Sequence, residues 1–126
     1  MKTKKILRFY FGADSLERVL DNLIISKACD FSGNTLETAE RLCEVIGDKI
    51  RLERLWGYLD GVLSSFSKDE RGALRLYSSR REVPLNESER RSANRVLIKF
   101  TRHARRIDDF TDGVEVLNRY YCLLKS

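Results

Sequence analysis

The sequence predicts an all-α fold, a single compact bundle of five or six helices with one long central helix whose pattern allows a kink. Apolar residues recur at three- and four-residue steps along most of the chain, which is the period of an amphipathic helix. Patterns typical of helix N-caps, Ser-x-x-Glu and Asn-x-x-Glu, precede two of these segments. No internal repeat or long linker divides the 126 residues, so we expect residues 1–126 to form one domain.

The N-terminal third contains one clear helical pattern. Residues 4–11 are short and rich in aromatic side chains, which permits a strand, so residues 1–12 are a candidate extended arm. Asp14 or Ser15 is the expected N-cap of the following helix, and the turn formers of residues 30–34 end it. The apolar stripe of this helix consists of Leu16, Val19, Leu20, Leu23, Ile24 and Ala28.

A helical pattern from Thr35 to about Ser65 is the predicted central helix. Its two apolar stripes are offset near residues 47–51, which predicts either a kink or two helices with Gly47 as a C-terminal cap. The first stripe is Leu36, Ala39, Cys43, Ile46 and Ile50, and the second is Leu52, Leu55, Leu59, Val62 and Phe66. One outward face carries an acidic rail, made of Glu37, Glu40, Glu44 and Asp48.

Three capping boxes are expected in the second half of the chain. They pair Ser67 with Glu70, Asn86 with Glu89, and Asp112 with Glu115. The first begins a short helix that ends near Tyr77, and the second begins a basic helix over residues 87–107. The third begins the last helix, whose inward side chains are Val114, Leu117, Tyr121 and Leu124.

Charge is distributed unevenly along the chain, whose net charge is +5. Residues 12–48 contain three basic and eight acidic side chains, net −5, whereas residues 71–106 contain eleven basic and three acidic ones, net +8. This asymmetry indicates either a polyanionic partner for the basic half or electrostatic docking between the two halves.

The basic helix is the strongest candidate for a functional surface. Its apolar side chains recur on one side and its cations on another, so the cations can contact successive phosphates of a nucleic acid. Guanidinium groups suit this role because they bind phosphate or guanine edges with two hydrogen bonds. The predicted nucleic-acid-binding residues are Arg90, Arg91, Arg95, Lys99, Arg102, Arg105 and Arg106. The alternative is that these cations solvate an outer face or pair with the acidic rail.

Two segments within residues 62–107 resemble region 4 of sigma-70-type transcription factors. VLSSFSKDERGALRLY, residues 62–77, resembles the opening of that region, and KFTRHARRI, residues 99–107, is similar to the basic end of its recognition helix. The resemblance implies a helix-turn-helix that contacts promoter DNA and RNA polymerase. The corresponding residues are Glu70, Arg71, Arg95, Lys99, Arg102, Arg105 and Arg106. The family's middle helix is replaced here by SSRREVPLN, residues 78–86.

Two aromatic segments are weaker candidates for stacking on bases. The first is residues 56–61, where Trp56 precedes the Gly57-x-x-x-Gly61 spacing that lets another helix approach. The second joins aromatic and basic side chains, namely Lys4, Lys5, Arg8, Phe9, Tyr10 and Phe11. Packing within the core is the simpler interpretation of the aromatic side chains in both segments.

The sequence predicts no catalytic residue, cofactor site or metal site, and we expect no enzyme. His103, the only histidine, lies among arginines and has no carboxylate in sequence reach that would orient it as a base. Cys29, Cys43 and Cys122 form no C-x-x-C pair and are expected to be reduced, mostly buried thiols of a cytoplasmic protein. No apolar run approaches the ~20 residues that span a bilayer, so we expect no membrane partner.

The leading hypothesis is therefore a small cytoplasmic nucleic-acid-binding protein, with DNA favoured and a bacterial type of transcription-associated role. The rival hypothesis is a protein–protein adaptor or inhibitor whose basic face docks on an acidic partner protein. The acidic rail and the basic helix together also allow a homodimer.

Overall fold

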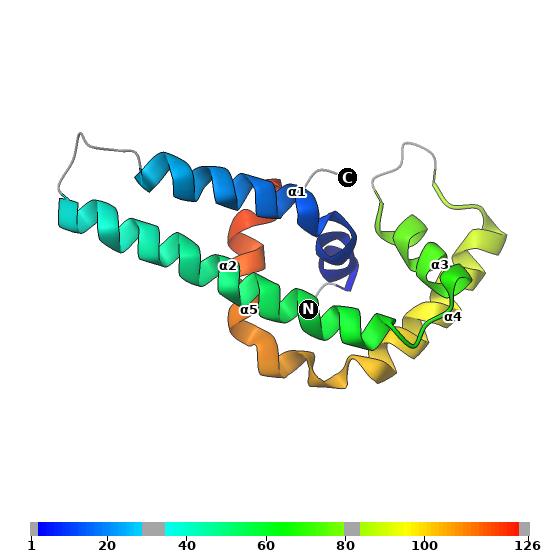
Figure 1. Ribbon diagram of the computed structural model, residues 1–126. Helices are drawn as coiled ribbons and strands as arrows, with labels where there is room; N and C mark the ends of the chain where they lie inside the picture. Colours follow the sequence, from blue (N-terminus) through cyan, green and yellow to red (C-terminus); the bar gives the residue numbers. More distant parts are fainter. Residues whose placement is uncertain (1–2, 29–34, 80–83, 124–126) are drawn as a thin grey trace.

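The computed structural model describes residues 3–28, 35–79 and 84–123, and nearly all of these residues lie in helices (Figure 1). The α-helices are α1 (Thr3–Ala28), α2 (Thr35–Leu63), α3 (Lys68–Ser78), α4 (Glu87–His103) and α5 (Thr111–Tyr120). Two 3₁₀ helices, η1 (Arg105–Phe110) and η2 (Tyr121–Leu123), precede and follow α5. The predicted all-α fold is confirmed.

Helices α1 and α2 lie antiparallel and form an elongated arm, while α3 and α4 pack together at the other end of the molecule (Figure 1). The chain then returns along α2 through η1, and α5 packs against the middle of α2. The N-terminal turns of α1 bend away from the arm and contact α3 (Figure 1). Because α2 contacts α1, α4, η1 and α5, it is the central helix that the sequence predicts.

One hydrophobic cluster runs through all five α-helices and η1. The second predicted stripe of α2 lies in it, with Leu52, Leu55 and Leu59 buried and Val62 half-buried. Phe66, just beyond the end of α2, is buried in the same cluster. The prediction for this half of α2 is therefore confirmed.

The first predicted stripe of α2 is wrong, because its side chains face outward. Leu36 is 68%, Ile46 39% and Ile50 44% exposed, and Ala39 and Cys43 are also exposed. This half of α2 belongs to the arm, and its buried side chains are instead Val45 and Asp48. Helix α2 also continues without interruption through Gly47, so Gly47 is not a C-terminal cap.

The strand or extended arm at residues 4–11 is also wrong, since α1 begins at Thr3. Phe9, Ala13, Leu16 and Leu20 follow one another at four- and three-residue steps, so a single helical stripe runs through both segments. Asp14 and Ser15 consequently lie inside α1 and cap nothing. Leu16 and Leu20 are buried as predicted, whereas the predicted turn at residues 30–34 lies outside the described residues.

Two of the three predicted capping boxes are present. Ser67 and Glu70 exchange side chain-to-backbone hydrogen bonds of 2.9 and 3.1 Å at the start of α3, and Asn86 and Glu89 exchange bonds of 2.8 and 3.0 Å at the start of α4. The box predicted at Asp112 is wrong. Helix η1 leads directly into α5 at Thr111, so no extended residue precedes α5 to act as a side-chain cap.

Helix α5 is held against α2 by a close approach of the two backbones and by the buried carboxylate of Asp48, which binds Arg119 and Tyr120 of α5. A Cβ at Gly113 would lie 3.0 Å from the Arg51 carbonyl oxygen and 3.1 Å from Leu55 Cβ, so only glycine fits without displacement. Leu117 is buried and Val114 and Tyr121 are half-buried, in line with their predicted inward positions, while Leu124 lies outside the described residues.

None of the described helices is both long enough and apolar enough to cross a membrane.

Candidate nucleic-acid interface

The outward face of α4 is fixed by the packing of its opposite side. Ala93, Val96 and Phe100 are buried, and Ala104 and Ile107 continue this apolar side into η1. The capping box at Asn86 and Glu89 sets where the helix begins, and therefore which residues lie one, two and three turns further along the same face. The predicted apolar side of the basic helix is therefore confirmed, and the basic side chains of α4 lie on the opposite, outward side.

Six of the seven predicted cations are exposed, and four of these form no ion pair with another residue in the described ranges. These four are Arg90, Arg95, Arg102 and Arg105. Arg95 and Arg102 are seven residues apart, which is two helical turns, so they lie on nearly the same line along α4. These guanidinium groups can reach an anion in solvent without first breaking a bond inside the chain.

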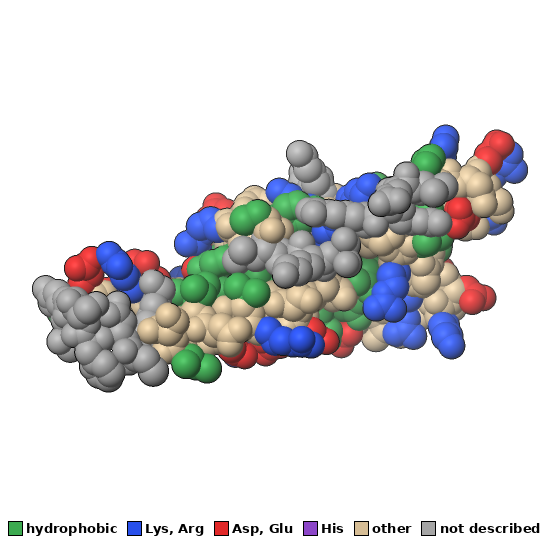
Figure 2. Space-filling model, turned by 90° about the horizontal axis from the view of Figure 1, so that it is seen from above, with side chains coloured by type: hydrophobic (Ala, Val, Ile, Leu, Met, Phe, Trp, Pro, Cys, Tyr) green, Lys and Arg blue, Asp and Glu red, His purple; other side chains and the backbone are tan. Residues whose placement is uncertain are grey.

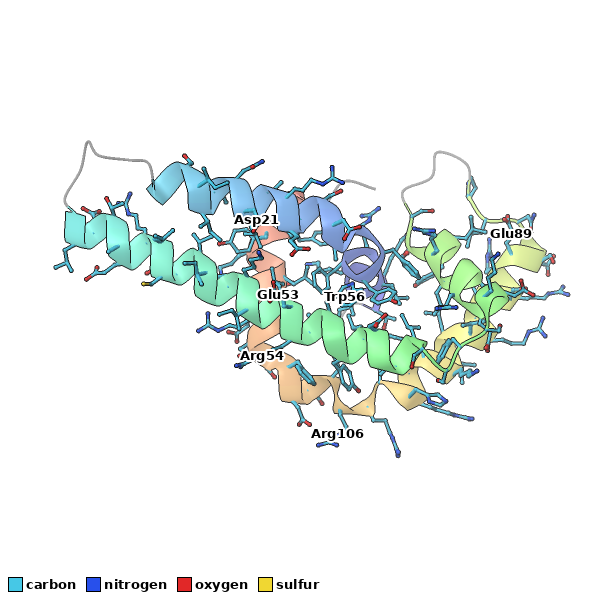
Figure 3. All side chains as sticks on the ribbon, in the orientation of Figure 1. Asp21, Glu53, Arg54, Trp56, Glu89 and Arg106 are labelled. Atoms are coloured by element: carbon cyan, nitrogen blue, oxygen red, sulfur yellow. The ribbon has the colours of Figure 1, made fainter. Side chains whose placement is uncertain are left out.

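Two further cations form ion pairs within their own helical segments. Arg91 pairs with Glu87 at 2.7 Å, and Arg106 pairs with Asp109 at 3.3 Å. All four side chains are exposed, and exposed pairs of this kind contribute little to stability because solvent screens them. Arg106 projects from η1 away from the helix bundle (Figure 3).

Lys99 differs from the other six because it connects α4 to α3. Its Nζ donates hydrogen bonds of 2.9 and 3.0 Å to the two carboxylate oxygens of Glu70, and it lies 4.5 Å from the centroid of the Phe66 ring. The backbone hydrogen bond from Ser67 and then the bond from Lys99 lower the pKa of Glu70. Lys99 therefore positions the basic helix relative to the preceding one.

An exposed isoleucine lies between the arginines, on a face for which the sequence pattern predicted only cations. Ile98 is 57% exposed, and it lines a shallow groove with Asn94, Leu97, Thr101 and Arg102. The spacing could have revealed it, because Ile98 lies three residues after Arg95 and four before Arg102. The outward face of α4 is thus basic with a small apolar centre.

The acidic rail does not neutralise this face within the described residues. Glu37 pairs with Arg41 on its own helix, and Asp48, which is only 3% exposed, binds Arg51 and Arg119. Asp48 is therefore not part of an outward rail, because Tyr120 and Arg119 of α5 cover it. Figure 2 shows Lys and Arg side chains standing out at the end of the molecule formed by α3 and α4.

The aromatic segments are occupied by packing inside the chain. Trp56 stacks on Tyr10 with ring centroids 5.4 Å apart, and its indole nitrogen donates to the Tyr10 carbonyl at 3.1 Å (Figure 3). Phe9 is buried, and Arg8 is buried against Tyr121, whose hydroxyl accepts a hydrogen bond of 2.9 Å from it. The first turns of α1 thus offer no open stacking platform.

The two glycines of the Gly-x-x-x-Gly spacing do not pack inside the described chain. A Cβ placed at Gly57 or Gly61 would meet nothing within 4 Å, so no helix of the described chain makes the close approach that this spacing allows. The glycine that does admit a neighbouring backbone is Gly113 of α5.

Among the described residues, the histidine and cysteine side chains do not form a common cluster. His103 is exposed and packs edge-on against Phe66 at 5.6 Å. Cys43 and Cys122 are exposed, so their predicted burial is wrong, and Cys29 lies outside the described residues. The described ranges contain no group of three or more His, Cys, Asp or Glu residues arranged to hold a metal ion.

A small cavity of about 170 Å³ lies between α1 and α2. Its apolar lining includes Phe9, Leu20 and Leu52, and its rim carries Lys49, which bonds to Asp21 at 2.6 Å. This volume is below the ~300 Å³ at which pockets for small organic ligands begin, so this cavity does not suit such a ligand.

No protein-family model, no curated protein and no solved structure matches this chain.

Proposed function

We propose that this protein binds nucleic acid, with DNA favoured, through the outward face of α4 and the start of η1. The observation that carries the proposal is the set of exposed arginines without ion pairs in the described part of the chain, Arg90, Arg95, Arg102 and Arg105. Each phosphate that such a group contacts releases condensed counterions, and this release supplies most of the affinity.

Arg91 and Arg106 join this set when a phosphate is near. Their pairs with Glu87 and Asp109 are exposed, so exchanging a carboxylate for a phosphate costs little. Lys99 stays with Glu70 and keeps α4 in place, so it contributes indirectly. The residues that we propose to contact phosphate are therefore the six predicted arginines, without Lys99.

The apolar centre of the face supports duplex DNA as the ligand. Asn94 has the donor and acceptor pair that matches an adenine edge in the major groove, and Ile98 and Thr101 can pack against thymine methyl groups. A helix that offers arginines beside such side chains suits contact with phosphates and base edges together.

A transcription-associated role is part of the proposal because of the resemblance to region 4 of sigma-70-type factors. The turn does not follow the helix-turn-helix pattern, since residues 79–86 join α3 to α4 whereas that motif uses about three or four residues. The proposal therefore concerns the basic face of α4 and not a helix-turn-helix geometry.

Titration of the protein into labelled mixed-sequence duplex DNA at several salt concentrations tests this function. We expect affinity to fall steeply as salt rises from about 50 to 200 mM. The double variant Arg95→Gln/Arg102→Gln should weaken binding and reduce the salt slope by about 2, because two phosphate contacts are lost. Its thermal stability should be nearly unchanged, since both side chains are exposed.

The matched control is Arg18→Gln/Arg41→Gln, which removes the same charge from exposed positions on the α1–α2 arm. It should bind DNA almost as the unaltered protein does. Equal weakening by both variants would show that net charge, and not α4, drives association. No binding at low salt would refute the proposal and favour an acidic protein as the partner of the same face.

A further inference from the structure

The outer face of α2 presents an apolar seam that no other helix of the described residues covers. Ala39, Cys43, Ile46 and Ile50 are exposed and follow one another at four-, three- and four-residue steps. This is the spacing of the a and d positions at which two helices pack in a coiled coil. A seam with this spacing suits a helix from outside the chain.

The same face continues into the two glycines of α2. Gly57 follows Ile50 by seven residues, so it lies on the same side of the helix, and Gly61 lies one turn beyond. Neither glycine has a neighbour within 4 Å of the Cβ position, and glycine inside a helix destabilises it relative to alanine. Another helix approaching from outside would use the space that the missing side chains leave.

The charges beside the seam indicate which helix fits. Glu40 and Glu44 lie on the N-terminal half of α2, and Arg54 lies on the C-terminal half, on the side away from α1 (Figure 3). Glu40 and Arg54 are each seven residues from Gly47, so a two-fold axis near Gly47 places Glu40 of one copy beside Arg54 of the other. In a parallel arrangement this flank would instead face the opposite flank of the other copy, which α1 covers, so Glu40 and Arg54 could not meet.

We propose that a second copy of this chain docks antiparallel on the outer face of α2 and forms an isologous dimer. The seam supplies the apolar contact, and the pairing of Glu40 with Arg54 sets the direction and the register. The proposal is independent of nucleic-acid binding, because the basic face lies on α4 and η1. A dimer would carry two such faces.

Sedimentation equilibrium over roughly micromolar to hundred-micromolar protein tests the dimer, because a contact between two single helices lies at the small end of stable interfaces. We expect a reversible monomer–dimer equilibrium. Ile50→Glu should weaken it at least about ten-fold, since each copy would bury a carboxylate in the seam. Ile25→Glu is the matched control, because Ile25 is 61% exposed on α1, and it should leave the equilibrium unchanged. Circular dichroism of both variants should show the helical content of the unaltered protein.

A charge exchange tests the direction of the pairing. Glu40→Arg and Arg54→Glu should each weaken the dimer, and the double variant Glu40→Arg/Arg54→Glu should restore it because the two charges have only changed places. A protein that stays monomeric throughout this range, or a dimer unaffected by Ile50→Glu, would overturn the proposal. Failure of the double variant to recover association would overturn the antiparallel arrangement.

Discussion

The carboxylate of Asp48 on α2 accepts a hydrogen bond of 2.8 Å from the hydroxyl of Tyr120 on α5, across 72 residues of sequence. Its other oxygen accepts a bond of 2.9 Å from Arg119, and the weaker contact to Arg51 is 3.4 Å long. Asp48 thus joins two helices through a buried charge that has polar partners on both of its oxygens.

Replacing Asp48 by alanine should lower the free energy of unfolding by about 2 kcal/mol, because the Tyr120 hydroxyl and the Arg119 guanidinium would lose their acceptor. Urea denaturation followed by circular dichroism measures this change. Glu44→Ala, one turn away on the surface, is the control and should change stability by less than about 0.5 kcal/mol. Equal stability of the two variants would show that the Asp48 contacts contribute nothing.

Tyr10 and Tyr120 should ionise at unusually high pH. Burial first, and then the hydrogen bonds to Asp60 and Asp48 respectively, raise the pKa of each phenol from 10.0 to about 12. Because the folded-state pKa is the higher one, the stabilisation is complete below pH 10.0 and is lost as the pH rises through about 12. The ultraviolet absorbance of tyrosinate, measured against pH, should lose a group that titrates near pH 12 in Tyr120→Phe. A loss confined to the ordinary range near 10.0 would contradict this assignment.

Glu70 should make stability depend on pH in the acidic range. Its folded-state pKa is lower than the ordinary value of 4.5, so ionised Glu70 stabilises the fold above that value, and the contribution disappears as the pH falls through the lowered pKa. Glu70→Gln keeps a capping side chain but loses the charge beside Lys99. The variant should be less stable than the unaltered protein near neutral pH, and this difference should shrink in acid. Glu87→Gln, which changes an exposed pair, should show almost no such dependence.

Gly113 and Gly72 should respond in opposite directions to the same substitution. Gly113→Ala would force its methyl group to 3.0 Å from the Arg51 carbonyl, so α5 must shift, and we expect a loss of about 1 to 3 kcal/mol. Gly72 lies in α3 with nothing within 4 Å of its Cβ position, so Gly72→Ala should stabilise the protein by up to about 1 kcal/mol through helix propensity. Thermal unfolding of the two variants measures both effects. A common direction for the two changes would contradict the packing of α5 on α2.

The sequence was sufficient to predict the features that depend on local spacing. The capping boxes at Ser67 and Asn86 form because each pair of partners is three residues apart, whatever the rest of the chain does. The buried side of α4 follows for the same reason, since Ala93, Val96 and Phe100 share one face of any helix.

Features that depend on distant neighbours were not predictable in this way. Ile46 and Ile50 have the spacing of a buried stripe, yet they are exposed because α1 and α5 cover other sides of α2. Asp48 has the spacing of an outward acidic residue, yet it is buried because Tyr120 and Arg119 reach it from α5. Periodicity assigns residues to faces, but the order in which helices pack decides which face is covered.

The candidate interface shows the same division. The outward positions of Arg95 and Arg102 follow from the helical period alone. The pairing of Lys99 with Glu70 does not, because 29 residues and a change of helix separate the two side chains. The exposure of Ile98 also follows from its spacing relative to Arg95 and Arg102. A pattern read for cations alone passes over it.

The contacts of the start of α1 with α5 and η2 have a consequence for biosynthesis. Lys5 bonds to Asn118 at 3.0 Å and Arg8 bonds to Tyr121 at 2.9 Å, so these turns of α1 are made before partners that follow more than a hundred residues later. Until then the buried side of α1 has only α2 and α3 to cover it. The part of this surface that α5 and η2 cover in the folded protein therefore stays exposed until they are made, and a chaperone that binds apolar surface has that interval in which to act.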